Sequence, residues 1–140
     1  MIEKITVTRD EVLHYPWLDH TWVDVHFQKN DVTQKPLFAK IVVAFIKKGV
    51  ERVTGNKYDG VMAENGYFFI KYDTDNIIGI LKKVAEWFLS GNVHFKDPEA
   101  AHAKFLEENK SAFIAFFEEM KDMLENKTYQ YYYQSIDGLN

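Results

Sequence analysis

The amino-acid sequence predicts an α+β fold: an antiparallel sheet of four to five strands, with two amphipathic helices and one long C-terminal helix packed mainly on one face. Two observations carry this prediction. Short segments alternate apolar and polar residues, as half-buried strands do, and longer segments repeat apolar residues at helical spacing. The elements read ββα-ββ-αα-β in chain order, and 140 residues suit one domain, so we expect a single α+β domain over 1–140.

The first two predicted strands are residues 2–8 and 20–28, joined by an irregular turn over 10–18 that Pro16 closes. The second segment has the clearest alternation in the chain. Its apolar set is expected on one face (Thr21, Val23, Val25 and Phe27) and its polar and aromatic set on the other (His20, Trp22, Asp24 and His26).

A helix is predicted over residues 36–54, because Pro36 suits the first helical turn and Gly55 suits the exit. Its apolar residues cover a wide arc, which indicates a central helix that contacts neighbours on more than one side. Gly49 interrupts the helix at a cost of about 1 kcal/mol relative to alanine, so we expect a looser last turn.

The strongest local signal is a hairpin, in which segments 58–63 and 67–73 flank Glu64-Asn65-Gly66. Asn-Gly supplies the positive φ angles that a tight hairpin turn requires. A second helix follows over 76–90, capped by Thr74 or Asp75 and ended by Gly91.

The third helix is expected to start at Asp97-Pro98, an N-cap followed by a proline at the first helical position. A seam of residues alternately four and three apart favours one continuous helix to about residue 125: His102, Leu106, Asn109, Phe113, Phe116, Met120 and Met123. The alternative is a break into two helices at Lys110-Ser111.

Two positions of this seam, His102 and Asn109, are polar. A polar side chain in an apolar seam costs stability unless it is paired, and it can fix an oligomeric state. We therefore expect self-association into a homodimer through His102, Asn109, Phe113 and Phe116. The alternative is that Asn109 marks a helix break or is satisfied within the core.

A tyrosine-rich tail over 129–134 is predicted to be a final strand or an extended arm. As a strand, it places Tyr129, Tyr131 and Tyr133 on one face and Tyr132 on the other. Tyrosine joins a rigid ring to a polar tip, which favours recognition of partners. Together with Trp22, these four tyrosines form the predicted partner-binding site. The alternative is a terminal strand that seals the core.

Composition excludes several classes of protein. There is no cysteine, so disulfide frameworks, cysteine-based zinc sites and thiol nucleophiles are excluded. The net charge of -4 argues against a general affinity for nucleic acid. We read no signal peptide, and no stretch approaches the roughly 18 apolar residues of a membrane span. The sequence therefore predicts a cytoplasmic protein with no membrane partner.

Catalytic constellations are scarce. No Gly-rich phosphate loop, nucleophile elbow or helical metal motif is present, so we expect no cofactor and no metal. The histidines are the side chains that titrate near neutrality. Asp24 and His26 share a strand face and give a weak acid–base candidate, which needs further groups such as His94 or His102.

Charge is unevenly distributed along the chain. Residues 32–58 hold six Lys/Arg against one acid, whereas 97–140 hold nine acids against four lysines. Lys35 precedes the first long helix, whose N-terminus attracts anions. Lys35, Lys57 and Tyr58 are accordingly the predicted anion-binding residues, with a small anionic ligand or nucleotide as the expected occupant.

The leading functional hypothesis is a small intracellular, non-enzymatic binding protein that docks on another macromolecule, with a protein as the expected partner. Inhibitors, immunity proteins, adaptors and phage or bacterial accessory proteins act in this way. The positive signal is an aromatic content of 16%, which exceeds what a core of this size needs. The alternatives are a protein that sequesters a small ligand or nucleotide, and a histidine-dependent hydrolase using Asp24 and His26.

Overall fold

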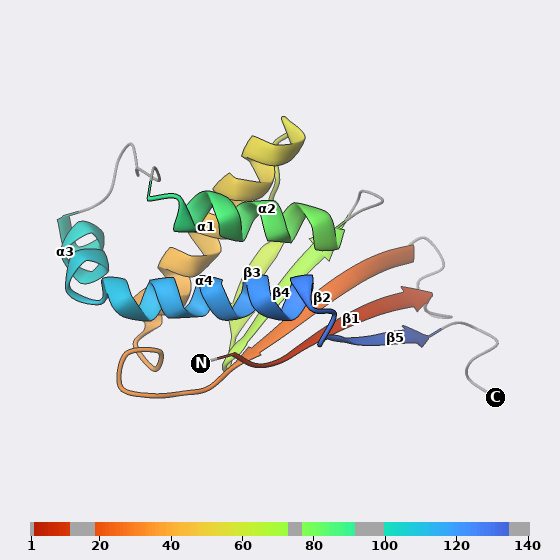
Figure 1. Ribbon diagram of the computed structural model, residues 1–140, viewed down its shortest axis with the longest axis horizontal. Coiled ribbons are helices and arrows are strands. Elements are labelled where there is room, and N and C mark those ends of the chain that lie inside the picture. Colours follow the sequence, from red (N-terminus) through yellow and green to blue (C-terminus); the bar gives the residue numbers. More distant parts are fainter. Residues whose placement is uncertain (1, 12–18, 73–76, 92–99, 135–140) are drawn as a thin grey trace.

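The computed structural model describes residues 2–11, 19–72, 77–91 and 100–134 of the chain. It shows an α+β fold in which helices cover one face of a single sheet (Figure 1). The strands are β1 (Ile2–Glu11), β2 (Asp19–Phe27), β3 (Val61–Glu64), β4 (Tyr67–Tyr72) and β5 (Gln130–Gln134). The helices are α1 (Pro36–Thr54), α2 (Ile77–Leu89), α3 (Ala100–Glu108) and α4 (Lys110–Glu125).

The sheet has the strand order β3-β4-β2-β1-β5, and the pairs β3–β4, β4–β2 and β2–β1 are antiparallel. The fifth strand differs from the prediction, because β5 pairs with β1 in parallel. The physical reason is the connection between β4 and β5, which runs through α2, α3 and α4. A helical crossover of this kind lets the chain enter the next strand in the same direction as the strand it left, and β4 has the direction of β1. The tail is therefore a strand rather than a free arm.

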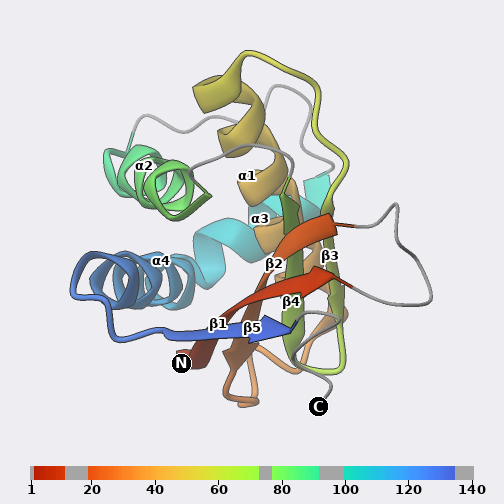
Figure 2. The ribbon, with the colours of Figure 1, turned by 90° about the vertical axis from the view of Figure 1, so that its right-hand side faces the viewer.

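The helical layer lies on one side of the sheet, and the other side carries none of the described helices (Figure 2). The core fills the space between the layers. Phe27 and Phe68 from the sheet stack at 4.8 Å between ring centroids, and Phe116 of α4 meets Phe68 edge-on at 5.4 Å. The next residue of α4, Phe117, stacks on Phe88 of α2 at 4.2 Å.

Helix α1 has the bounds that the sequence predicts, but its last turn is not loose. Gly49 is buried, and a Cβ added there would lie 2.5 Å from a methyl carbon of Val84. The missing side chain lets α1 and α2 approach closely at this point. Gly49 is thus a packing device, and the expectation of a frayed helix end is corrected.

The predicted long C-terminal helix is two helices, α3 and α4, divided at Asn109. Asn109 has φ -121° and ψ 25°, outside helical geometry, and its side-chain Nδ2 donates to the Phe105 carbonyl at 3.0 Å. The side chain therefore satisfies a backbone acceptor at the end of α3. Of the two sequence interpretations of Asn109, the structure supports the helix break.

The predicted hairpin is present. Asn65 has φ 50° and Gly66 has φ 87°, the two positive values of a tight hairpin turn. Strand β3 begins at Val61 and is shorter than predicted; just before it, the Tyr58 hydroxyl contacts the carbonyl oxygens of Gly60 and Lys71. Among the described residues, no helix is both long enough and apolar enough to cross a membrane.

Candidate functional site

Strand alternation gives the sheet one covered face and one open face. Ile5, Val7, Val23, Val25, Phe27, Phe68 and Ile70 are buried beneath the helices. The intervening residues occupy the opposite side, which we call the open face: Lys4, Thr6, Asp24, His26, Met62, Glu64, Tyr67, Phe69 and Lys71. None of the described helices lies over it (Figure 2).

Three rings on the open face contact one another. Tyr67 stacks on Phe69 with centroids 5.8 Å apart and planes inclined by 15°. His26, in the paired strand β2, meets Tyr67 edge-on at 4.1 Å. Met62 is 55% exposed and pairs across β3–β4 with Phe69, while Tyr67 is 37% exposed. The result is an apolar, ring-rich surface at the β3–β4 side of the sheet.

A carboxyl group lies within this surface. Asp24 pairs with Phe69 on one side and Thr6 on the other. Burial raises the pKa of Asp24 above its ordinary value, and the nearby His26 opposes that shift. Ionisation of Asp24 in the folded protein therefore costs free energy.

Of the predicted partner-binding residues, Trp22 and Tyr131–Tyr133 lie in strands whose backbone the structure describes, while their side chains lie outside the described part. The backbone register places Tyr132, Thr8, Trp22 and Lys71 in one row across the sheet. Tyr129 is half-buried and packs against the core. The partner-binding role of these residues remains a prediction.

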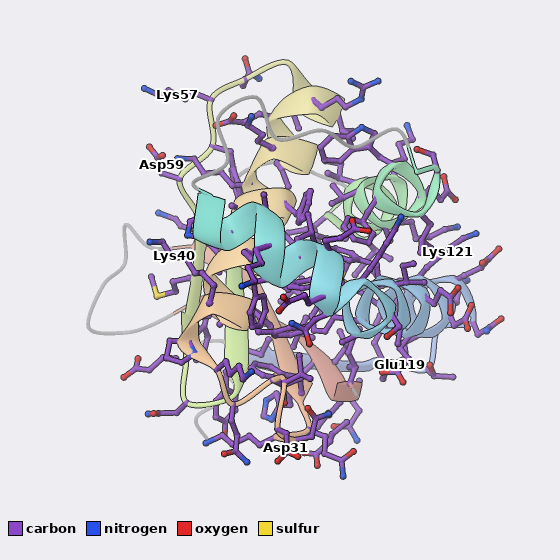
Figure 3. All side chains as sticks on the ribbon, turned by 90° about the vertical axis from the view of Figure 1, so that its left-hand side faces the viewer. Asp31, Lys40, Lys57, Asp59, Glu119 and Lys121 are labelled. Carbon is purple, nitrogen blue, oxygen red and sulfur yellow. The ribbon has the colours of Figure 1, made fainter. Side chains whose placement is uncertain are left out.

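The predicted anion-binding residues are not brought together. Lys35 precedes α1, whereas Lys57 and Tyr58 follow it, and a helix of 19 residues separates them by about 28 Å. Figure 3 shows Lys57 at the opposite end of the molecule from Asp31, which lies in the loop before α1. The Lys35 ammonium instead lies 5.7 Å from the Phe105 ring centroid. The prediction that these three residues form one anion site is therefore corrected.

The predicted self-association residues divide between the interior and the helix break. Phe113 and Phe116 are fully buried, and each contacts Phe38 of α1 within this chain. Their rings therefore cannot contact a second copy in this fold, so the prediction is corrected for them. Asn109 lies at the break between α3 and α4, where its side chain donates to the Phe105 carbonyl. His102 is half-buried in α3.

The acid–base candidate consists of neighbours on the open face. Asp24 and His26 lie on the same side of β2, whereas His102 belongs to α3 in the helical layer. His94 lies outside the described residues. The backbone of His20 is described, but its side chain is not. Within the described ranges, no group of three or more His, Asp or Glu residues could hold a metal ion.

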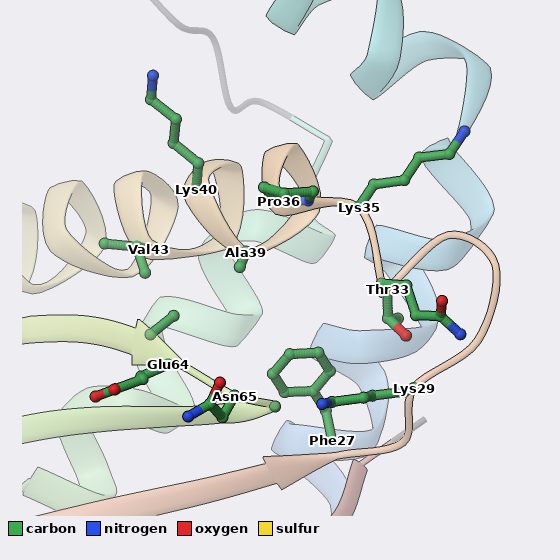
Figure 4. Close-up of a pocket in the computed structure, with 13 residues that line it drawn as sticks. Phe27, Lys29, Thr33, Lys35, Pro36, Ala39, Lys40, Val43, Glu64 and Asn65 are labelled. Atoms are coloured by element: carbon green, nitrogen blue, oxygen red, sulfur yellow. The ribbon is translucent and has the colours of Figure 1, made fainter.

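A cavity of about 650 Å³ lies between the first half of α1 and the β3–β4 hairpin (Figure 4). We call it the α1–β3 groove. Its lining combines apolar residues, three lysines and polar loop residues: Phe27, Lys29, Thr33, Gln34, Lys35, Pro36, Ala39, Lys40, Val43, Ala63, Glu64, Asn65 and Gly66.

The sequence analysis did not single out Met62, Tyr67 and Phe69 as surface residues. The signal for Tyr67 and Phe69 was in β4, where Tyr67-Phe68-Phe69-Ile70 carries large apolar residues at consecutive positions. Since a strand points successive side chains to opposite faces, such a run puts rings on both faces.

Comparison with family models, with curated proteins and with solved structures gives no match for this chain.

Proposed function

We propose that this protein is a non-enzymatic docking module that binds a partner protein through the open face of its sheet. One observation carries the proposal: Met62, Tyr67 and Phe69 form a contiguous apolar cluster on a face that none of the described helices covers. Exposed apolar clusters bordered by polar groups mark interaction sites in soluble proteins.

The chemistry of the cluster suits a protein interface. Aromatic side chains and methionine are enriched at interface centres, because they bury much area with few rotatable bonds or adapt to irregular shapes. The cluster is bordered by Lys71 on β4 and Glu64 on β3, which gives it a mixed polar rim.

A nucleic acid fits this face less well. Stacked rings on a sheet can bind bases, but such surfaces also need cationic groups that track the phosphates. Here the Asp24 carboxyl lies in the middle of the face, next to Phe69, and Glu64 lies at its edge. These acids repel phosphate, so the arrangement supports a protein partner over a nucleic acid.

The test is site-specific photo-crosslinking in cells of the source organism. Benzoyl-phenylalanine replaces Tyr67 on the open face or, in the matched control, Lys83, which is exposed on α2. We expect a discrete protein adduct from position 67 and none from position 83. The adduct is then identified by mass spectrometry.

A second variant checks that the contact runs through the cluster. Phe69→Ser, combined with the crosslinker at position 67, removes one stacked ring while leaving the covered face unchanged. We expect the adduct to weaken strongly. Equal adducts from positions 67 and 83, or no protein adduct from position 67, would contradict the proposal.

A further inference from the structure

The α1–β3 groove borders the free edge of the sheet. Strand β3 is terminal in the strand order, and β4 is its single neighbour among the described strands. An edge strand presents backbone N–H and C=O groups that another extended chain can pair with. The groove meets the open face at Glu64, while the rest of its lining lies toward α1, the loop before α1 and the hairpin turn.

The hairpin register shows which backbone groups point outward. In a two-residue hairpin, the residues next to the turn bond each other, and bonded pairs then recur at every second position. Lys71 N donates to Gly60 O at 2.7 Å, which fits this parity. The bonded pairs are therefore 64/67, 62/69 and 60/71. The backbone groups of Val61 and Ala63 face away from β4, toward the open edge.

The floor of the groove is apolar and shallow. Ala39 and Val43 of α1 and Ala63 of β3 line it, and Phe27 lies at the end toward the loop before α1 (Figure 4). Small side chains on both walls leave room for the side chains of an added strand. Thr33 makes the adjoining loop firm, because its Oγ1 donates to Gln28 O at 2.8 Å and accepts from Asn30 N at 2.7 Å.

The rim of the groove is cationic although the whole chain carries a net charge of -4. Three lysines line it against a single carboxylate, that of Glu64. The Lys29 side chain passes over Gly66, so its ammonium lies near the turn. The Lys35 side chain extends toward Phe105, and the exposed Lys40 side chain points away from the hairpin (Figure 4). A positive potential at the mouth favours acidic partners.

We infer that the α1–β3 groove binds an extended, acidic segment of a partner protein as an additional strand beside β3. The segment pairs its backbone with Val61 and Ala63. Alternate side chains enter the apolar floor between β3 and α1, and acidic side chains that flank the paired residues meet Lys29, Lys35 and Lys40. Strand addition of this kind takes affinity from main-chain hydrogen bonds and specificity from alternate side-chain pockets.

The experiment selects binding peptides from a random library, so the partner need not be identified first. A phage library of random twelve-residue peptides is panned on the folded full chain, and the recovered peptides are sequenced. We expect enrichment of Asp and Glu on either side of a short segment that has apolar residues at alternate positions. A recovered peptide is then synthesised, and its affinity is measured by fluorescence anisotropy at two salt concentrations.

Two groove variants and two controls locate the binding. Lys40→Glu reverses an exposed rim charge and is expected to weaken binding by about three- to tenfold, whereas Lys83→Glu makes the same charge change on α2 and leaves binding unchanged. Ala63→Pro removes an outward N–H and is expected to abolish binding, with its fold checked by circular dichroism. Tyr67→Ser on the open face leaves binding intact, which separates this inference from the docking proposal.

Amide hydrogen exchange of the bound state completes the test. We expect slower exchange at Val61 and Ala63 on addition of the peptide. The inference is overturned if panning enriches no acidic peptides, if Lys40→Glu and Lys83→Glu bind equally, or if the two amides keep their exchange rates.

Discussion

The two faces of the sheet are built from the same strands and differ in what covers them. On β4, Phe68 is fully buried, while its neighbour Tyr67 is 37% exposed. The covered face is a close-packed set of rings from the sheet, α1 and α4, whereas the described rings of the open face, His26, Tyr67 and Phe69, contact one another. Ring content in a strand therefore does not report burial; the arrangement of the helices decides it.

The largest expected effect tests this contrast on adjacent residues of one strand. Phe68→Ala leaves a cavity between the layers and is expected to cost about 3–5 kcal/mol of unfolding free energy. Phe69→Ala removes the same ring from the open face and is expected to cost no more than about 1–2 kcal/mol. Urea denaturation followed by circular dichroism measures both. Similar losses for the two variants would remove the distinction between the faces.

An intermediate effect is expected where the helical layer is packed most closely. Gly49→Ala places a Cβ against Val84, a β-branched residue that is stiff in a helix. We expect a loss of about 1–3 kcal/mol, although alanine improves helix propensity by about 1 kcal/mol. Thermal denaturation measures it, and the double variant Gly49→Ala/Val84→Ala serves as the control.

That double variant is expected to be more stable than the sum of the two single changes predicts, because it relieves the clash. Stabilisation by Gly49→Ala alone would show that α1 and α2 do not approach as closely as the structure indicates.

The smallest expected effect is electrostatic and belongs to the open face. Burial raises the pKa of Asp24 in the folded protein above its ordinary value of 3.8, so the folded state holds this proton more tightly than the unfolded state. The carboxyl therefore lowers stability as pH rises from 3.8 through the folded-state pKa. Asp24→Asn removes this penalty, and its stability relative to the original protein is expected to increase between about pH 3 and pH 7.

Urea denaturation at several pH values measures this difference, with Glu64→Gln as a control on an exposed carboxylate of the same face. A constant difference across pH for Asp24→Asn would contradict the burial of its charge. A bound partner that covers the open face would enlarge the effect.

Much of the fold follows from local sequence signals. Pro36 and Gly55 bound α1, Asn65-Gly66 forms the hairpin turn, and the alternation of Val23 and Val25 assigns the covered face of β2. Each of these is a short-range rule of backbone geometry or periodicity. They hold here because packing agrees with them.

The features that sequence reasoning missed depend on long-range contacts. The parallel pairing of β5 depends on where α4 returns the chain, and the role of Gly49 depends on the position of Val84. The α1–β3 groove combines Lys29, Lys40 and Ala63 from three segments. The seam that predicted one long helix is continuous in spacing, but the backbone leaves helical geometry at Asn109, whose side chain bonds the Phe105 carbonyl at the end of α3.

The partnership of β1 with β5 has a consequence for synthesis of the chain. Thr6 pairs with Gln130, which lies 124 positions further along the chain. Until the ribosome has synthesised residues 130–134, the edge of β1 that pairs with β5 has no partner strand. Contacts between residues so distant in sequence also form slowly. Nascent chains that stall before this point expose an adhesive strand, which makes truncated products of this protein prone to aggregate.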